Sequence, residues 1–272
     1  MTGFLGRAND ALLVVLLINV GVLLPVALLA EFPNYGLTLR AVVFFAIAGL
    51  VGTLGGRAFY YVAIERIGAS RSAPLKSTTP LFATIIAVIL LGERPTPGNY
   101  VGIVLMVVGI AVVTWEANDD DAAGADRLLD FGIPLFSAFL FGIEPTFAKL
   151  GFAEGTPVFV GLILKTGAGA LGVLAYLRWR EGIPSLTALR GDRTSMKWYA
   201  FAGLSNTVFL LGYYFSLSVA SVSIVSPIQQ TSPLLIVGIS AALLPQKEEV
   251  TWRVWVAAGL VVLGAIAITF FG

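Results

Sequence analysis

The sequence predicts an all-α polytopic membrane protein, a helical bundle of two inverted-topology repeats with nine transmembrane helices. Three observations lead to this prediction. Of the 272 residues, 57% are hydrophobic and only 12% are charged, whereas soluble domains have about 25% charged residues. Nine segments are apolar enough, or nearly so, to cross a bilayer. The two halves of the chain also share a motif that contains two prolines.

The composition excludes several classes of function. The mean hydropathy is +0.90 and the net charge is +1, so there is no electrostatic reason to bind nucleic acid. The chain has no cysteine and no histidine, which removes thiolate metal sites and the commonest general base. It lacks the phosphate-binding G-x-x-x-x-G-K-[ST] loop and the H-E-x-x-H and G-x-S-x-G motifs. We therefore expect no enzyme activity, no cofactor and no metal.

The nine apolar segments are expected to be unbroken helices, because lipid cannot pair with backbone N–H and C=O groups. The first segment is too long for the apolar part of a signal peptide and is interpreted as a span. The segments are Ala11–Ala30, Ala41–Ile64, Ser72–Leu91, Asn99–Trp115, Phe131–Leu150, Pro157–Leu177, Trp198–Val219, Ser221–Leu244 and Trp252–Phe271.

An internal repeat divides the chain. Shifting the sequence by 153 residues places Tyr60-Tyr61 on Tyr213-Tyr214 and "PLKSTTPLF" on "PIQQTSPLL", with both prolines in register. Five helices separate the matching positions, so the repeats must insert in opposite orientations. We predict a first repeat of four helices at 1–118, an acidic linker at 119–127 and a second repeat of five helices at 128–272. The counterpart of Phe131–Leu150 is absent at the start, and we expect the sequence to begin late rather than to have lost this helix.

Three stretches carry a resemblance to a known family. They are "PLFATIIAVILLGERPTPGNYVGIVLMVVGI" (Pro80–Ile110), "PLLIVGISAALLPQKEEV" in the second half and "FLFGIEPTFAKLG" (Phe139–Gly151). The chain resembles the EamA-like family of the drug/metabolite transporter superfamily over nearly its whole length. The resemblance implies a ten-helix bundle, here without its first helix, whose central cavity exports or exchanges small solutes.

The proline motif predicts part of the substrate site. Pro80 has no N–H, so the carbonyl of Lys76 loses its helical partner, and Pro233 does the same to Gln229. Pro74 and Pro227 are tolerated if they lie in the first turns of helices. We therefore expect each repeat to open a helix start toward a polar cavity. The predicted lining residues are Lys76, Thr78, Gln229, Gln230 and Thr231. The alternative for Lys76 is that its ammonium group reaches the membrane surface.

Charged residues inside the predicted helices suggest the substrate class. Lys165 lies near the middle of its helix, where a charge costs about 2.5–3.5 kcal/mol. Glu144 is the only intramembrane carboxylate and the only candidate for carrying a coupling proton. With Lys76 and Arg57, three basic groups face one acidic group, which favours a solute with a carboxylate or phosphate. The alternatives are a structural ion pair of Lys165 with Glu144, and an Arg57 that reaches the surface.

Aromatic and small residues complete the prediction. Tyr60 and Tyr213 are candidates for stacking on a solute, although the two tyrosine pairs could equally form an aromatic belt at the membrane surface. Five glycines fall at helical spacings that allow close helix packing, namely Gly49, Gly52, Gly56, Gly98 and Gly102.

The predicted function is a secondary carrier that exports or exchanges a small metabolite, anionic or amphoteric, by alternating access between the two repeats. Its partners are the lipid bilayer, the solute and a proton or counter-substrate, and a homodimer is left open. We expect a multi-pass protein of the cell membrane, the plasma membrane of a prokaryote. The alternatives are a flippase for lipids or polyisoprenoids and a membrane partner protein that transports nothing.

Overall fold

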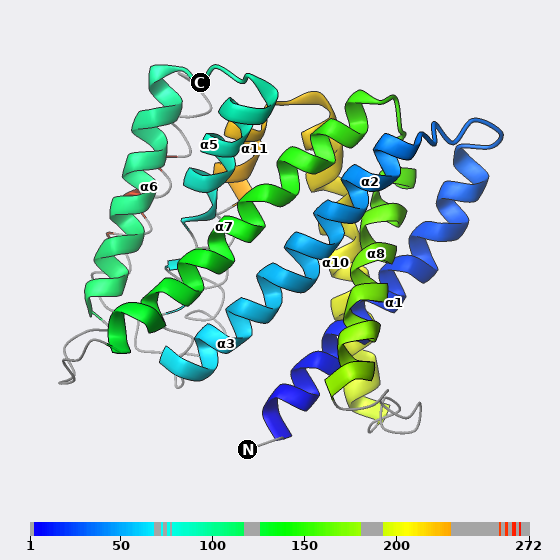
Figure 1. The fold of residues 1–272 in the computed structure, drawn as a ribbon, viewed down its shortest axis with the longest axis horizontal. Coiled ribbons are helices and arrows are strands. Elements are labelled where there is room, and N and C mark those ends of the chain that lie inside the picture. Colours follow the sequence, from blue (N-terminus) through cyan, green and yellow to red (C-terminus); the bar gives the residue numbers. More distant parts are fainter. Residues whose placement is uncertain are drawn as a thin grey trace. The chain divides into compact units, whose positions relative to one another are not determined.

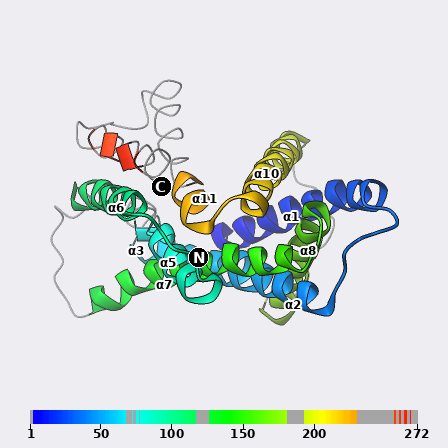
Figure 2. The same cartoon turned by 90° about the horizontal axis from the view of Figure 1, so that it is seen from above.

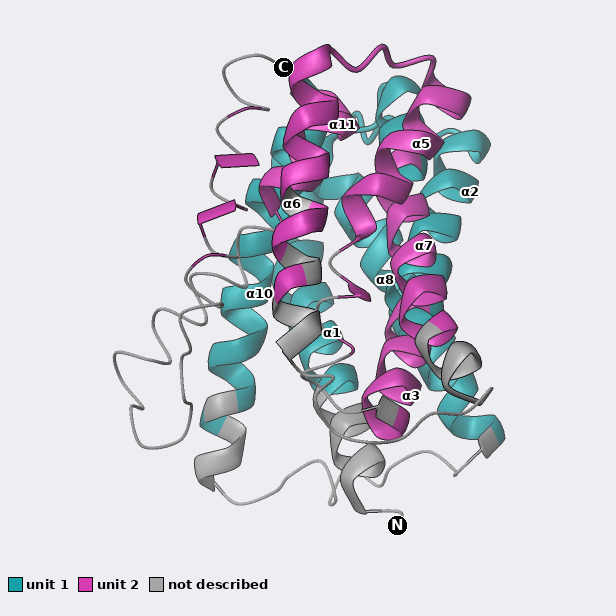
Figure 3. Ribbon diagram, turned by 90° about the vertical axis from the view of Figure 1, so that its left-hand side faces the viewer, with its two compact units in different colours: residues 1–55, 147–219 teal, residues 56–146, 220–272 magenta. Residues whose placement is uncertain are grey.

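The computed structural model describes residues 3–67, 72, 75–76, 78–116, 126–180 and 193–229, with a few isolated positions beyond 255 (Figure 1). All elements in these ranges are helices. The chain forms two compact units, residues 1–55 with 147–219 (unit 1) and residues 56–146 with 220–272 (unit 2) (Figure 3). Each unit combines residues from both halves of the sequence. The repeat boundaries at 119–127 are a different division of the chain and stay a prediction.

Unit 1 is built around helix α8 (Val158–Arg180). The helices α1 (Gly3–Ala30), α2 (Leu39–Ala48) and α10 (Arg193–Val219) all pack against it (Figure 2). Helix α1 also packs against α10. The buried core of this unit consists of Leu23, Ala41, Phe45, Ala148, Leu162, Leu210 and Tyr214.

Unit 2 contains the helices α3 (Arg57–Ile67), α5 (Thr79–Leu91), α6 (Pro97–Glu116) and α11 (Val222–Gln229). It also contains most of α7 (Asp126–Ala153). Helix α11 packs against α5 and α6. Helices α5 and α7 meet at Gly142, where an added Cβ would lie 2.8 Å from the Cβ of Phe82.

Among the residues that the structure describes, five helical segments are long and apolar enough to cross a membrane. They are Leu12–Ala30, Leu39–Arg66, Gly132–Ala153, Val158–Trp179 and Tyr199–Val219. These segments match five of the nine predicted spans. Among the rest, α5 covers the predicted span Ser72–Leu91 from Thr79 onward; Ser72, Leu75 and Lys76 are also helical, and Thr78 lies in a turn between them and α5. Most of Ser221–Leu244 and Trp252–Phe271 lies outside the described residues, so the count of nine stays a prediction.

The span Leu39–Arg66 changes its helix type in the middle. Between α2 and α3 the segment Gly49–Gly56 is π-helical. The sequence GLVGTLGG lacks side chains at four of these eight positions, which suits the wider π-helix. An added Cβ at Gly49 would collide with the carbonyl oxygen of Lys165 on α8, and one at Gly56 would lie 3.1 Å from the ring of Phe141. The predicted packing role is confirmed at these two positions.

Replacing Gly49 with alanine should destabilise the protein by about 1–3 kcal/mol, because the new methyl group meets backbone that cannot rotate away. The measurement is thermal unfolding of the purified protein in detergent. Gly167→Ala on α8 is the matched control, since nothing lies within 4 Å of its Cβ position and alanine favours the helix. Equal unfolding midpoints for the two variants would contradict the close packing.

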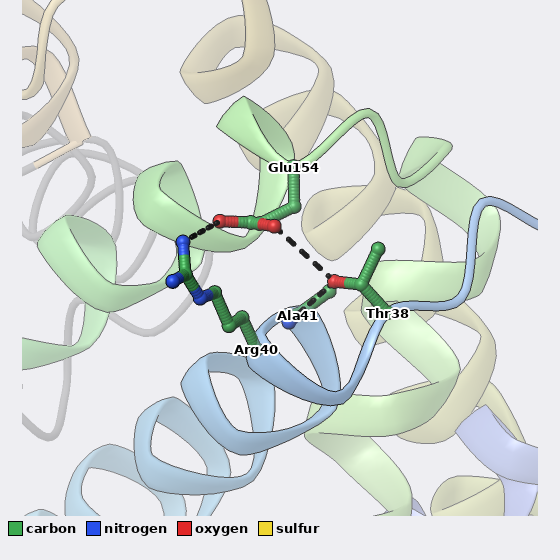
Figure 4. A network of polar contacts seen from close by, with 4 residues as sticks. All are labelled: Thr38, Arg40, Ala41 and Glu154. Atoms are coloured by element: carbon green, nitrogen blue, oxygen red, sulfur yellow. Dashed lines mark hydrogen bonds and ion pairs between the residues drawn. The ribbon is translucent and has the colours of Figure 1, made fainter.

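Two connections at one end of unit 1 fix the ends of its helices. Thr38 caps α2 by accepting a hydrogen bond from the N–H of Ala41 (3.0 Å), and its hydroxyl donates to Glu154 (3.4 Å) (Figure 4). Arg40 lies 4.0 Å from the same carboxylate, and its side chain is 80% exposed, so this ion pair contributes little. The hydroxyl of Thr156, just before α8, donates to the carbonyl of Gly36 (2.8 Å). These bonds tie α2 to the connection between α7 and α8.

Candidate functional site

Lys76 lies on two aromatic rings in unit 2. Its Nζ is 5.1 Å from the ring centre of Tyr60 on α3 and 4.8 Å from that of Phe141 on α7. A cation over an aromatic face is attracted by about 0.5–2 kcal/mol. This position argues against the alternative in which the ammonium group reaches the membrane surface. Tyr60 was a predicted site residue, whereas Phe141 was not.

Two further charged residues lie close enough to Lys76 to interact with it electrostatically. The charges of Arg57, at the start of α3, and of Glu144, on α7, both act on its ammonium group. Glu144 is 9% exposed. Unit 2 therefore brings together three of the predicted charged residues, with two positive groups for one negative group. Such an arrangement can hold an anionic group against the positive side chains while the carboxylate moderates the excess charge.

A second lysine lies on a tyrosine in unit 1. Lys165 on α8 is 5% exposed, and its Nζ is 5.3 Å from the ring centre of Tyr214 on α10. Tyr214 is fully buried and packs edge-on against Phe152. The predicted site residue Tyr213 instead stacks on Phe209, with ring centres 6.0 Å apart. Tyr213 stays a predicted site residue, and Tyr214 is the member of the pair that lies beneath Lys165.

The helix start at α5 differs from the prediction. The carbonyl of Lys76, which Pro80 deprives of its helical partner, accepts a hydrogen bond from the hydroxyl of Thr79 (2.6 Å). The carbonyl of Leu75 accepts one from the hydroxyl of Thr78 (2.7 Å). The two threonines therefore satisfy the broken backbone, and the freed carbonyl is not simply open to a cavity. Thr78 stays a predicted site residue, since its oxygen can still accept a hydrogen bond.

Pro227 would be tolerated in the first turn of a helix, but it is the sixth residue of α11. It frees the carbonyl of Ser223, toward which the side-chain amide of Asn99 donates at 3.4 Å. Gln229 ends α11. The predicted site residues Gln230 and Thr231 and the helix-breaking Pro74 and Pro233 lie outside the described residues.

The loop of the L-G-E-R motif holds the start of α11. Glu93 accepts hydrogen bonds from the backbone N–H groups of Val222 (2.8 Å) and Ser223 (3.1 Å) and from the Ser223 hydroxyl (2.6 Å). A carboxylate here satisfies N–H groups that the helix leaves unpaired and complements its dipole. We name these contacts the Glu93 clasp. Sequence reasoning missed it, although the glutamate is part of the family motif.

Within the ranges that the structure describes, no three histidine, cysteine, aspartate or glutamate side chains gather to hold a metal ion. The groups that the structure brings together here are ammonium, guanidinium, carboxylate, hydroxyl and aromatic groups.

Comparisons with known proteins agree with this arrangement of helices. The family model for the EamA-like transporter family matches residues 8–115 and 131–270. A protein of Archaeoglobus fulgidus named as an uncharacterized transporter is 24% identical over 217 residues, which are 79% of this chain and 73% of that protein. An uncharacterized protein of Methanocaldococcus jannaschii is 28% identical over 95 residues, 35% of this chain and 69% of its own. A solved crystal structure, 18% identical, matches 97% of this chain and 90% of its own with a TM-score of 0.72.

Proposed function

Because this chain belongs to the EamA-like transporter family, and so is a multi-pass membrane transporter, we propose that it is a secondary carrier for a small anionic or amphoteric metabolite. It exports or exchanges the solute by alternating access through a central cavity between two inverted repeats. It acts in the plasma membrane of a prokaryotic cell. We also propose that this sequence forms nine transmembrane helices.

The observation that carries the substrate class is the position of Lys76. Its ammonium group lies over Tyr60 and Phe141, and the charges of Arg57 and Glu144 act on it. Ionisable groups inside a membrane are costly and face partners or the transport path. Two positive groups and one negative group leave a net positive charge, which favours the carboxylate or phosphate of a solute.

Glu144 supports a proton as the coupling ion. It is a buried carboxylate, and it directly precedes Pro145 inside α7. A carboxylate inside a membrane protein commonly belongs to a proton relay. Exchange against a counter-substrate is the other energy source for transport that is compatible with this site.

Solute counterflow in proteoliposomes tests the proposal. The panel contains carboxylates, sugar phosphates, amino acids and cationic amphiphiles. We expect saturable uptake of at least one anion. Lys165→Gln should raise its half-saturation concentration about tenfold, as expected when a charged hydrogen bond is lost.

Lys197→Gln is the matched control, because this lysine on α10 is exposed. It should transport like the wild type. If Lys165→Gln takes up the anion as the wild type does, Lys165 has no role in binding the anion. Uptake of cationic amphiphiles alone would contradict the anionic substrate, and no uptake of any solute would contradict the carrier itself.

A further inference from the structure

Three buried hydroxyl groups in unit 2 have no hydrogen-bond partner within the described part of the chain. They belong to Thr84 on α5, Thr146 on α7 and Ser226 on α11, which are 4%, 0% and 1% exposed. A hydroxyl inside a helix normally donates to a carbonyl one turn earlier. An unpaired polar group at such depth is unfavourable and requires an explanation.

Other helix hydroxyls of this protein show the ordinary behaviour. Thr166 donates to Leu162 (2.6 Å), and Thr207 donates to Gly203 (2.9 Å). Ser216 donates to Gly212 (2.9 Å). The exceptions are therefore not a general property of this fold, and all three belong to the same unit.

The helix α5, which carries Thr84, contacts the helices that carry the other two hydroxyls. Helix α11 packs against α5. Helix α7 meets α5 where Gly142 lies against Phe82 and the backbone of Ala83. Thr84 directly follows Ala83, and Thr146 lies one turn beyond Gly142 on the same side of α7.

Each hydroxyl also lies next to, or one turn beyond, a proline that removes a backbone N–H from its helix. Thr146 follows Pro145, and Ser226 precedes Pro227. Thr84 lies one turn beyond Pro80, at the start of α5. In membrane proteins, broken helical backbone is tolerated where it lies inside the protein or along a polar cavity. The prolines are thus a second observation, independent of the hydroxyls, that points to the same part of unit 2.

We propose that Thr84, Thr146 and Ser226 form a subsite that binds the hydroxyl groups of a hydroxylated organic anion. This inference rests on the proposed carrier function and narrows its substrate to anions that bear hydroxyl groups. Each protein hydroxyl can both donate and accept, which matches a solute hydroxyl. The anionic group of the same solute lies at Lys76. Ser226 lies one turn before the predicted site residue Gln229, so both lie on one side of α11.

A pair of solutes that differ only in their hydroxyl groups tests this subsite. Counterflow of glycerate is compared with that of propionate in the full-length protein and in Thr84→Val, Thr146→Val and Ser226→Ala. The wild type should prefer glycerate by about tenfold or more, because a site with hydrogen-bonding groups rejects the analogue that lacks the partner. Each variant should lower glycerate uptake about three- to tenfold and leave propionate uptake unchanged.

Ser216→Ala is the matched control for Ser226→Ala, since the hydroxyl of Ser216 bonds within its own helix. It should keep the preference of the wild type. Variants that slow both solutes equally, or that leave the preference intact, would overturn the subsite while the carrier function stands. A wild type that transports no anion at all would instead contradict the proposed function.

Thermal unfolding supplies a readout that needs no transport. Without solute, Thr146→Val should raise the unfolding midpoint, because valine removes an unpaired buried hydroxyl. Glycerate should raise the midpoint of the wild type and do so much less for Thr146→Val. Equal effects of glycerate on the two proteins, or no effect on either, would overturn the proposal.

Discussion

Replacing Lys76 with glutamine is expected to weaken the binding of anionic solutes about ten- to a hundredfold while the protein stays folded. The ammonium group is the cation that Tyr60 and Phe141 hold in place, and hydrogen bonds to charged groups contribute about 1.5–3 kcal/mol. Glutamine already occupies the matching position 229 of the other predicted repeat, so the substitution suits this fold. The measurement is the half-saturation concentration in counterflow.

Two further variants sharpen this prediction. Lys76→Arg should keep part of the affinity, because arginine also binds over aromatic rings but presents a different hydrogen-bond geometry. Adding Gln229→Lys to Lys76→Gln should restore anion binding if both positions face one cavity. An unchanged half-saturation concentration in Lys76→Gln would leave Lys76 as a structural residue.

Helices could be predicted from the sequence where a segment is long and apolar enough to cross a membrane. Five predicted spans coincide with helices long enough to cross a membrane. The start of α5 could not be predicted in this way. The mean hydropathy of a segment contains no information on which hydroxyl groups donate hydrogen bonds to nearby carbonyl groups. Thr78 and Thr79 pair with local carbonyl groups through such bonds, and α5 begins at Thr79 with Pro80 as its second residue. The π-helical segment Gly49–Gly56 likewise depends on its packing neighbours.

The charged candidate residues could be picked out from the sequence, because a charge inside an apolar helix is rare. Lys76, Glu144 and Lys165 were all named on that ground, and the structure gives the two lysines aromatic neighbours. That Phe141 and Tyr214 would lie against these lysines was not predicted. Aromatic residues are common in membrane helices, and only the packing of distant segments decides which of them lies beneath a cation.

The partners of Glu93 could not be predicted from the sequence either. Its partners Val222 and Ser223 lie 129 and 130 residues away in the sequence. No spacing rule connects positions so far apart in one chain. The motif could be recognised, but its physical role becomes visible only where the loop after α5 meets the start of α11.

Replacing Glu93 with alanine is expected to lower the free energy of unfolding by about 2–4 kcal/mol and to abolish most transport. The Glu93 clasp satisfies two backbone N–H groups and one hydroxyl at the start of α11, and losing a charged helix cap has a cost of this order. The stability and transport of Glu93→Gln should lie between those of the wild type and Glu93→Ala, because one amide oxygen remains to accept a hydrogen bond. The measurements are thermal unfolding in detergent and counterflow on the same preparations.

Glu65→Ala on α3 is the matched control, since this glutamate is exposed, and it should change neither quantity. The clasp determines more than stability, because α11 carries both Ser226 and Gln229. A loosened α11 should raise the half-saturation concentration for solute even under conditions where Glu93→Gln is fully folded. If Glu93→Gln unfolds earlier but binds solute as the wild type does, the clasp is only a structural cap. If affinity falls while the unfolding midpoint holds, Glu93 is a positioning residue for the substrate site.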